Sequence, residues 1–219
     1  MNQMPRGYVG VALTAVTLAC GLLAAGCARG EAHTSPTGEQ LYAACEHCHG
    51  TGGEGKVELS APKLAGLPAW YLTRQLQRFK DGTRGKHPDD EKGLRMRAMA
   101  RQMMSDAEVD AVVAYVAAMP DVEVIPTLPE PDPAAGGADF AACAVCHGEK
   151  GEGNESIMAP RIARLNDWYV ASQIRKYRSG IRGGAEGDDV GAAMREMVNK
   201  AVAPERIDNL AAYIQRLPG

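Results

Sequence analysis

Apolar residues recur at spacings of three and four along most of this chain, which is the period of an amphipathic α-helix. The pattern predicts helices over residues 38–48, 68–80 and 105–119, the second of them opening on Pro68. An Asp-Gly pair at 81–82 would end this second helix, and Ser105 with Glu108 forms a capping box for the third. No segment alternates apolar and polar residues as a strand would, so we predict an all-α fold.

The same pattern occurs twice, because a shift of 98 residues superposes the second half of the sequence on the first without a gap. The copies extend from about residue 37 to 120 and from about residue 136 to 219, and Pro204 opens the last helix of the second copy. This self-similarity indicates that one domain was duplicated. Matched positions include Tyr42 with Phe140, Trp70-Tyr71 with Trp168-Tyr169, Gln75 with Gln173, Arg84-Gly85 with Arg182-Gly183, and Tyr115 with Tyr213.

Residues 121–135 join the two copies and contain four prolines, which favours an extended strap of about 3 Å per residue. Four linker residues are acidic and none is basic, whereas each copy holds 11 Lys and Arg against 11 Asp and Glu. The formal net charge of −3 therefore comes mainly from the linker. Such neutral domains argue against nucleic acid as a partner.

The first 27 residues have the features of an export signal. An uncharged apolar run over residues 8–26 follows a single Arg and ends in Leu-Leu-Ala-Ala-Gly before Cys27. This junction resembles a bacterial lipobox, whose Cys is lipidated and becomes the mature N-terminus; an uncleaved membrane helix or an ordinary secretory cleavage is the alternative. Residues 28–36 would then form a short polar tether. We therefore expect a periplasmic protein that is anchored to the membrane through Cys27.

The sequence Cys-x-x-Cys-His occurs once in each copy, at residues 45–49 and 143–147. Two thiols one helical turn apart can add to both vinyl groups of one porphyrin, which leaves His49 or His147 to reach the iron. A Cys pair alone would also suit a redox dithiol or half a zinc site, but neither requires the His. Two covalent haem c groups are thus predicted. Their attachment residues would be Cys45, Cys48, Cys143 and Cys146.

Aromatic residues make up only 5% of the chain, which is little for the cores of two domains of about 80 residues each. A large apolar cofactor in each domain would supply the missing core, so we expect the apo-protein to fold poorly. The two remaining cysteines, Cys20 and Cys27, lie in the leader. No thiol is left for a structural disulfide or for ligation of iron.

With these motifs the chain resembles the diheme cytochromes c of the c4 type. The resemblance covers nearly everything after residue 37, and its haem motifs are followed by PKLAGLPAWYLTRQLQRFKDGTRG and PRIARLNDWYVASQIRKYRSGIRGG. The Met-rich segments MRAMARQMMSDAEVDAVVAYV and MREMVNKAVAPERIDNLAAYI complete it. The resemblance implies two tandem class I cytochrome c domains joined by a Pro-rich linker.

The resemblance also implies roles for individual residues. The carbonyl groups of Pro62 and Pro160 would hold the proximal imidazoles of His49 and His147, although each proline could be a simple loop breaker. A glycine and an aromatic residue on the first helix of each copy would pack against an aromatic residue on the last. These residues would be Gly38, Tyr42 and Tyr115, and then Gly136, Phe140 and Tyr213.

Two pairs of methionines are Met in both copies, Met96 with Met194 and Met99 with Met197. In the c4 pattern the distal ligand is followed by apolar residues three and seven positions later, which favours Met96 and Met194 as iron ligands. Met99 and Met197 stay as alternatives, with packing at the haem edge as their other role. The chain departs from the family pattern at residues 103–104, where two Met replace the usual Leu before the capping Ser.

Ligation by His and Met leaves no open position on the iron, and the thioether favours Fe(II) and raises the potential. This predicts an electron-transfer protein rather than an enzyme. Its redox protein partners would be a quinol-oxidising complex as donor and a terminal oxidase or reductase as acceptor. The alternatives are the cytochrome subunit of a dehydrogenase, such as a flavocytochrome, and a diheme peroxidase, which would need one iron with a displaceable ligand.

Replacing Cys45 and Cys48 together by Ala is expected to remove one covalent haem and to leave the other, because each copy has its own attachment motif. Mass spectrometry of the denatured chain would count the haem groups. Two covalent haems in this double variant would contradict the assignment.

Overall fold

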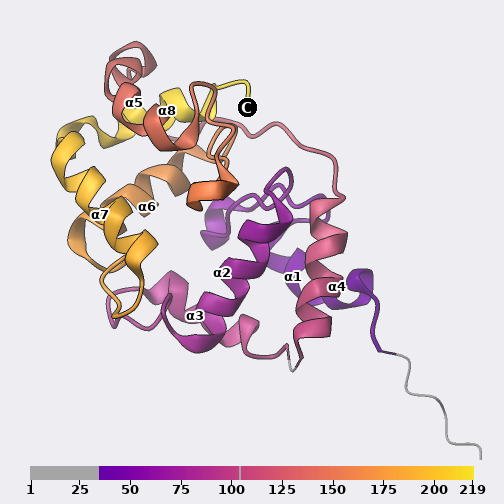
Figure 1. The fold of residues 1–219 in the computed structure, drawn as a ribbon. Coiled ribbons are helices and arrows are strands. Elements are labelled where there is room, and N and C mark those ends of the chain that lie inside the picture. Colours follow the sequence, from indigo (N-terminus) through magenta and orange to yellow (C-terminus); the bar gives the residue numbers. More distant parts are fainter. Residues whose placement is uncertain (1–34, 104) are drawn as a thin grey trace, which may run out of the picture. The chain divides into compact units, whose positions relative to one another are not determined.

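Each half of the chain folds into four α-helices in the computed structural model (Figure 1). The structure describes residues 35–103 and 105–219, so the predictions for the leader and for Cys27 lie outside the described residues. The first repeat consists of α1 (Gly38–His49), α2 (Ala69–Asp81), α3 (Glu91–Ala100) and α4 (Asp106–Ala117). The second repeat consists of α5 (Pro133–His147), α6 (Asp167–Ser179), α7 (Asp189–Ala201) and α8 (Ile207–Gln215).

The all-α prediction is confirmed, since the described part of the chain contains no strand. Extended pairing there is limited to two isolated bridges, Lys56 with Ala61 and Asn154 with Ala159. Three short 3₁₀ turns complete the regular structure of these residues. They span Val57–Leu59, Glu155–Ile157 and Pro204–Arg206.

Three prolines shift helix ends from their predicted places. Pro68 is the N-cap of α2 and not its first residue, because its ψ of 143° is extended. Pro204 opens a 3₁₀ turn, and α8 begins only after it. Pro133 is the first residue of α5, with the Asp132 side chain accepting hydrogen bonds from two amides of the first turn. The last three residues of the predicted strap are therefore helical.

Polar side chains cap several of the helices. The predicted capping box of α4 is confirmed, because Ser105 Oγ accepts from the Glu108 amide at 3.2 Å and Glu108 Oε2 accepts from the Ser105 amide at 2.9 Å. The apolar pattern did not single out α3 or α7 as separate helices. Asp90 and Asp188 cap them, each accepting from the amide three residues ahead at 3.0 and 2.9 Å. These two caps were the available sequence signal.

The first and last helices of each repeat cross at a glycine. An added Cβ on Gly38 would lie 2.1 Å from the carbonyl oxygen of Ala111, so α1 and α4 could not approach as closely with a larger residue. The rings of Tyr42 and Tyr115 pack beside this crossing, with centroids 5.5 Å apart. The contacts expected from the resemblance are present in both repeats. Their counterparts in the second repeat are Gly136, Asn209, Phe140 and Tyr213.

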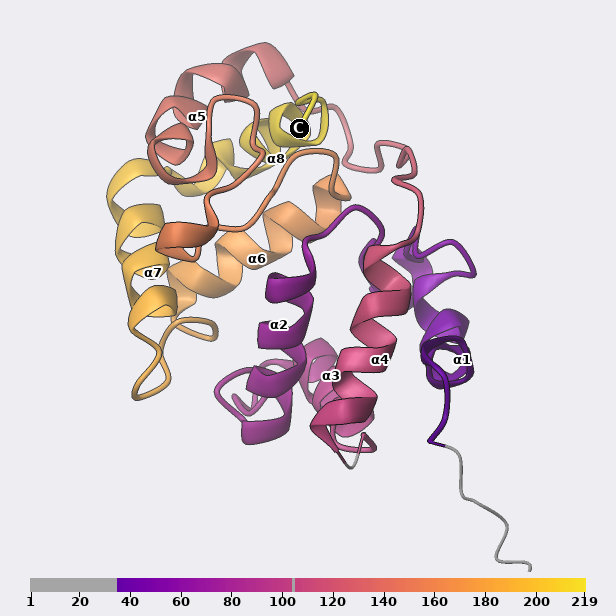
Figure 2. The same cartoon turned by 45° about the vertical axis from the view of Figure 1, so that its right-hand side comes forward.

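Residues 36–219 form one compact unit, in which α2 and α6 lie beside the boundary between the repeats (Figure 2). Two ion pairs cross this boundary. Arg78 Nη1 lies 2.6 Å from Asp188 Oδ1, and Lys176 Nζ lies 2.5 Å from Asp90 Oδ1. Arg78 matches Lys176 in the repeat and Asp90 matches Asp188, so the contacts are reciprocal, as they are in a twofold-related dimer.

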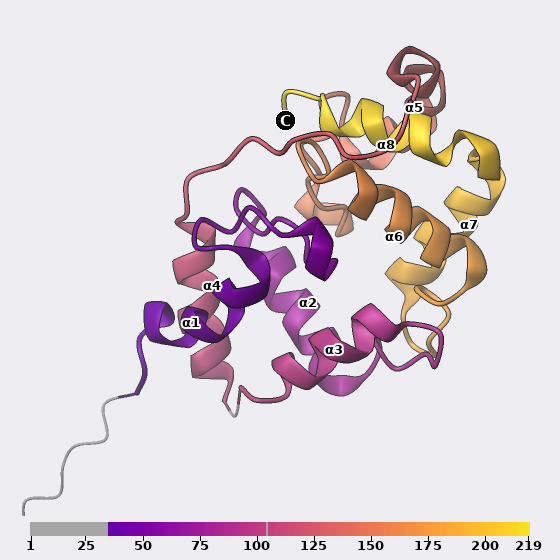
Figure 3. The same cartoon turned by 180° about the vertical axis from the view of Figure 1, so that it is seen from behind.

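The linker from Asp121 to Asp132 has no regular secondary structure and passes from α4 to α5 (Figure 3). It is bound to the second repeat along its length. Gln215 Nε2 donates to the Val124 carbonyl oxygen at 3.1 Å, and the Thr127 amide donates to a carboxylate oxygen of Asp167 at 2.8 Å. The linker therefore holds the repeats in a fixed relation rather than separating them.

The substitution Gly38→Val is expected to destabilise the holoprotein by about 2 kcal/mol, since overpacking of this order follows when a side chain enters a filled crossing. Chemical denaturation followed by circular dichroism would measure the change. Ala43→Val, at an exposed position of α1, is the matched control and should cost only about 0.5 kcal/mol. Equal losses for the two variants would contradict the close crossing of α1 and α4.

Candidate haem sites

The two motif histidines lie at the C-terminal ends of α1 and α5 and are buried. His49 is 7% exposed, and its Nδ1 lies 2.7 Å from the carbonyl oxygen of Pro62. His147 is 6% exposed, and its Nδ1 lies 2.7 Å from the carbonyl oxygen of Pro160. A carbonyl only accepts, so Nδ1 carries the proton and donates, which leaves Nε2 free to bind a metal. Both expected proline contacts are therefore made.

The loop over residues 49–62 is folded so that this bond can form. The Gly55 amide donates to the carbonyl oxygen of His49 at 2.8 Å. Gly55 has a φ of +82°, and an added Cβ would lie 2.5 Å from the amide nitrogen of Lys63. Only glycine fits such a place without strain. Gly153 occupies the matching position in the second repeat, with a φ of +90°.

Burial determines the protonation of the site residues. It lowers the pKa of His49 and His147 more than the bonds to the proline carbonyls raise it, so both imidazoles are neutral and suited to a metal. Burial, aided by the nearby Asp139 charge, raises the pKa of the Cys143 thiol to about 11, and burial also raises that of Cys45. These thiols stay protonated at neutral pH, unlike the low-pKa cysteine of a redox dithiol.

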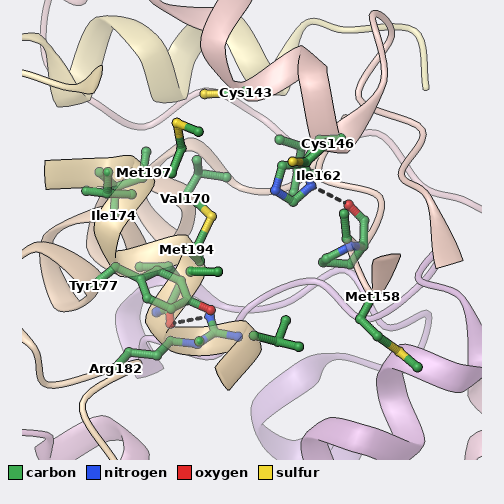
Figure 4. A pocket seen from close by; sticks show the side chains of 18 of the residues that line it. Cys143, Cys146, Met158, Ile162, Val170, Ile174, Tyr177, Arg182, Met194 and Met197 are labelled. Atoms are coloured by element: carbon green, nitrogen blue, oxygen red, sulfur yellow. Dashed lines mark hydrogen bonds between the residues drawn. The ribbon is translucent and has the colours of Figure 1, made fainter. Parts of the chain in front are cut away.

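A cavity of about 620 Å³ occupies the second repeat (Figure 4). It is lined by Cys143, Cys146 and His147, and by apolar side chains such as Val170 and Ile174. Cavities of this size bind large organic ligands. The attachment residues and the candidate proximal ligand of the second repeat are thus brought together on the wall of one apolar cavity.

The methionines differ in how they lie. Met158, Met194 and Met197 all line the cavity, but Met158 is 44% exposed and lies at a distance from the two methionines of α7 (Figure 4). In the first repeat Met96 is partly buried, but Met99 is 37% exposed. Exposure therefore favours Met96 over Met99 as a residue that faces a cofactor.

Two arginines meet across the boundary between the repeats with neutral partners only. Arg84 and Arg182 both line the cavity, and within residues 35–103 and 105–219 neither forms an ion pair. Each guanidinium donates to one glutamine in each repeat and to a tyrosine of the opposite repeat. The bonds are Arg84 to Gln75 (2.7 Å), Gln173 (3.0 Å) and Tyr169 (2.9 Å), and Arg182 to Gln173 (2.9 Å), Gln75 (3.2 Å) and Tyr71 (3.2 Å).

The chemistry of this cavity fits a haem group. A partly buried guanidinium is stable only with hydrogen-bonding partners and favours an anion, and haem carries two propionate groups. Arg84 and Arg182 are matched positions of the sequence repeat, but no local motif marks them as binding residues. The wall also includes Arg74 and Arg78 of the first repeat, so side chains of the first repeat complete the cavity of the second repeat. Arg74 is matched by Ser172 and has no basic counterpart.

Several known proteins are similar to this chain in sequence and in fold. Residues 35–120 and 134–218 each match the family described as Cytochrome c. Cytochrome c4 of Azotobacter vinelandii is 33% identical over 217 residues, which cover 94% of this chain and 98% of that protein. The thiosulfate dehydrogenase electron acceptor of Stutzerimonas stutzeri strain A1501 is 31% identical over 178 residues, covering 73% of this chain and 74% of that protein. The crystal structure of reduced cytochrome c4 from Pseudomonas stutzeri covers 82% of this chain and 96% of its own, with a TM-score of 0.63 and 28% identity.

The chain therefore belongs to the cytochrome c family, as a diheme protein of the cytochrome c4 type. The predicted fold of two cytochrome c domains and the two covalent haem c groups are confirmed by this membership. So is the prediction of an electron-transfer protein rather than a catalytic enzyme.

Proposed function

We propose that the protein is a periplasmic, membrane-anchored carrier that takes electrons from a quinol-oxidising complex and delivers them to a terminal oxidase or reductase. The observation that carries this proposal is the pair of buried imidazoles, each held at 2.7 Å by a proline carbonyl in both repeats. Two sites that are built alike from a histidine and a proline carbonyl suit reversible transfer of single electrons. A catalytic centre would instead require an iron with an open or displaceable ligand position.

In this proposal His49 and Met96 bind one iron, and His147 and Met194 bind the other. Haem supplies reversible one-electron chemistry when it is bound. The carbonyl groups of Pro62 and Pro160 orient the imidazoles by accepting a hydrogen bond from Nδ1, which also raises the basicity of the ligand. The thioethers favour the reduced state and close the distal side to small molecules.

A second function is favoured by one of the relatives. The thiosulfate dehydrogenase electron acceptor of Stutzerimonas stutzeri resembles this chain over 73% of its length. In this second function, the chain with the two haem motifs at residues 45–49 and 143–147 would receive electrons as the cytochrome subunit of a dehydrogenase. Purification of the native protein under mild conditions would decide between the two functions, because a stoichiometric catalytic subunit would accompany only an acceptor subunit.

Replacing Met96 or Met194 by Leu is expected to abolish the Met–Fe charge-transfer band of one ferric haem and to open that iron to carbon monoxide. The potential of the same haem should fall by roughly a hundred millivolts, since axial ligands set haem potentials over about 0.8 V. Met99→Leu and Met197→Leu are the matched controls and should only perturb packing. Optical spectra, redox titration and carbon monoxide binding would measure these effects.

The controls also separate an error in the ligands from an error in the function. Loss of the band only on replacing Met99 and Met197 would leave the carrier but change its ligands. Ready uptake of carbon monoxide by the unmodified protein, or reduction of peroxide at an appreciable rate, would instead contradict a carrier with two closed sites.

Cys27→Ser is expected to release the protein from the membrane fraction or to block its maturation, because the lipobox cysteine would be the only lipid attachment. None of the helices in the described residues is long and apolar enough to cross a membrane. Cell fractionation and mass spectrometry of the mature N-terminus would measure anchoring and lipidation. Unchanged membrane retention together with a wild-type N-terminus that lacks lipid would favour an uncleaved N-terminal helix.

A further inference from the structure

The first residue of the linker contacts loops of both repeats. Asp121 Oδ1 lies 2.5 Å from Nζ of Lys63, and its Oδ2 lies 2.9 Å from Nη2 of Arg161. Nε of Arg164 lies 3.5 Å from the same Oδ2. One carboxylate therefore joins a cation of the first repeat to two cations of the second.

The two nearest of these cations occupy matched positions beside the haem sites. Lys63 directly follows Pro62, and Arg161 directly follows Pro160. Each is thus joined directly to the carbonyl group that accepts the hydrogen bond from Nδ1 of the motif histidine. The proline carbonyl and the amide nitrogen of the next residue lie in one rigid peptide plane, so fixing Lys63 or Arg161 restricts the orientation of this carbonyl.

Lys63 is fixed from several sides. Its side chain is 2% exposed, and Nζ also donates to the carbonyl oxygens of Val122 at 2.5 Å and Arg164 at 3.1 Å. Its backbone amide donates to Asn166 Oδ1 of the second repeat at 2.7 Å. A buried ammonium in such a position is stable only with a counterion, and Asp121 is the acid that it contacts.

Arg161 of the second repeat in turn binds the loop of the first repeat. Its Nη1 donates to the carbonyl oxygen of Gly66, in the loop that follows Lys63, at 3.2 Å. The position that matches Asp121 in the second repeat is Gly219, which has no carboxylate side chain. The duplicated loops therefore share a single acid that the linker supplies.

The electrostatics agree with this geometry. Burial would raise the pKa of Asp121, but the hydrogen bonds from Lys63 and Arg161 outweigh burial and hold the pKa below its usual value. Asp121 is therefore ionised throughout the neutral range. Its contribution to stability is fully present above the unfolded pKa near 3.8 and is lost as the pH falls through the lower folded value.

We propose that Asp121 is a positioning residue for both haem sites, which fixes the two proline carbonyls against the proximal histidines at the same time. It acts through Lys63 on the first repeat and through Arg161 on the second. The inference rests on the proposed function only in that His49 and His147 are the iron ligands.

The test compares Asp121→Asn with the wild-type holoprotein. Loosening of both loops should speed solvent exchange of the two histidine Nδ1 protons in the ferrous protein by about tenfold, which is the weakening expected when a charged hydrogen bond is lost nearby. Both haem potentials should rise, because weaker hydrogen bonding lowers the basicity of the imidazoles. NMR would follow exchange of the Nδ1 protons and of core amides such as those of Val109 and Leu210.

Two further variants make the test specific. Glu123→Gln removes the same charge from an exposed linker position two residues away and should leave both exchange rates unchanged. Arg161→Gln removes the ion pair with Asp121 and the bond to Gly66 but leaves Lys63 paired with Asp121, so it should speed exchange of the His147 proton more than that of the His49 proton.

The outcomes are distinct. Faster exchange at both histidines, with unchanged core amides, supports the proposal. Exchange that is unaltered at either histidine in Asp121→Asn would overturn it, even if the potentials shift, and so would uniformly faster exchange of the core amides. Wild-type protein without protected Nδ1 protons at its two haems would instead show that the proposed ligation itself is wrong.

Discussion

The hydrogen bond from a buried imidazole to a proline carbonyl organises each half of this protein. It fixes the tautomer of His49 and His147 and directs Nε2 away from the backbone. The loop that supplies the carbonyl must return closely on itself, and Gly55 makes this possible by adopting a positive φ where a side chain would collide. Helix end, loop and candidate ligand thus form one unit, which duplication has produced twice.

The boundary between the repeats has the chemistry of an anion site rather than of an ordinary hydrophobic interface. Arg84 and Arg182 come from opposite repeats and donate hydrogen bonds to amide and hydroxyl oxygens. The carboxylates of Asp90 and Asp188 form ion pairs with Lys176 and Arg78 instead. Among the residues that the structure describes, these two guanidinium groups have no counterion, which suits the acidic propionates of haem. Residues that join the repeats therefore also line the cavity of the second haem site.

Duplication gives reciprocal contacts, but two features break the symmetry. Arg74 of the first repeat reaches the cavity of the second, whereas the matching Ser172 carries no charge. Asp121, the first residue of the linker, forms ion pairs with cations of both repeats and has no carboxylate counterpart at Gly219. The surroundings of the two sites consequently differ although the repeats are built alike, and differences in nearby charge and burial are among the factors that set haem potentials.

Much of the site could be predicted from the sequence, because its parts are close together in the chain. Cys45, Cys48 and His49 lie within one helical turn, so their spacing alone defines a haem motif. The 98-residue repeat then determined the number of domains, and capping and helical periodicity located most of the helices. Helix α3 was not predicted from the sequence because its charged and apolar residues do not form a clear stripe.

Only the tertiary structure decided how the halves are joined. Arg84 and Tyr169 are 85 residues apart, and Lys63 and Arg161 meet at Asp121 from opposite repeats. No local pattern encodes such contacts, because charged residues on a helix or loop look alike whether they face solvent or a partner. The sequence by itself determined two haem sites; the folded chain determined that the two repeats share an interface, an arginine pair and one carboxylate.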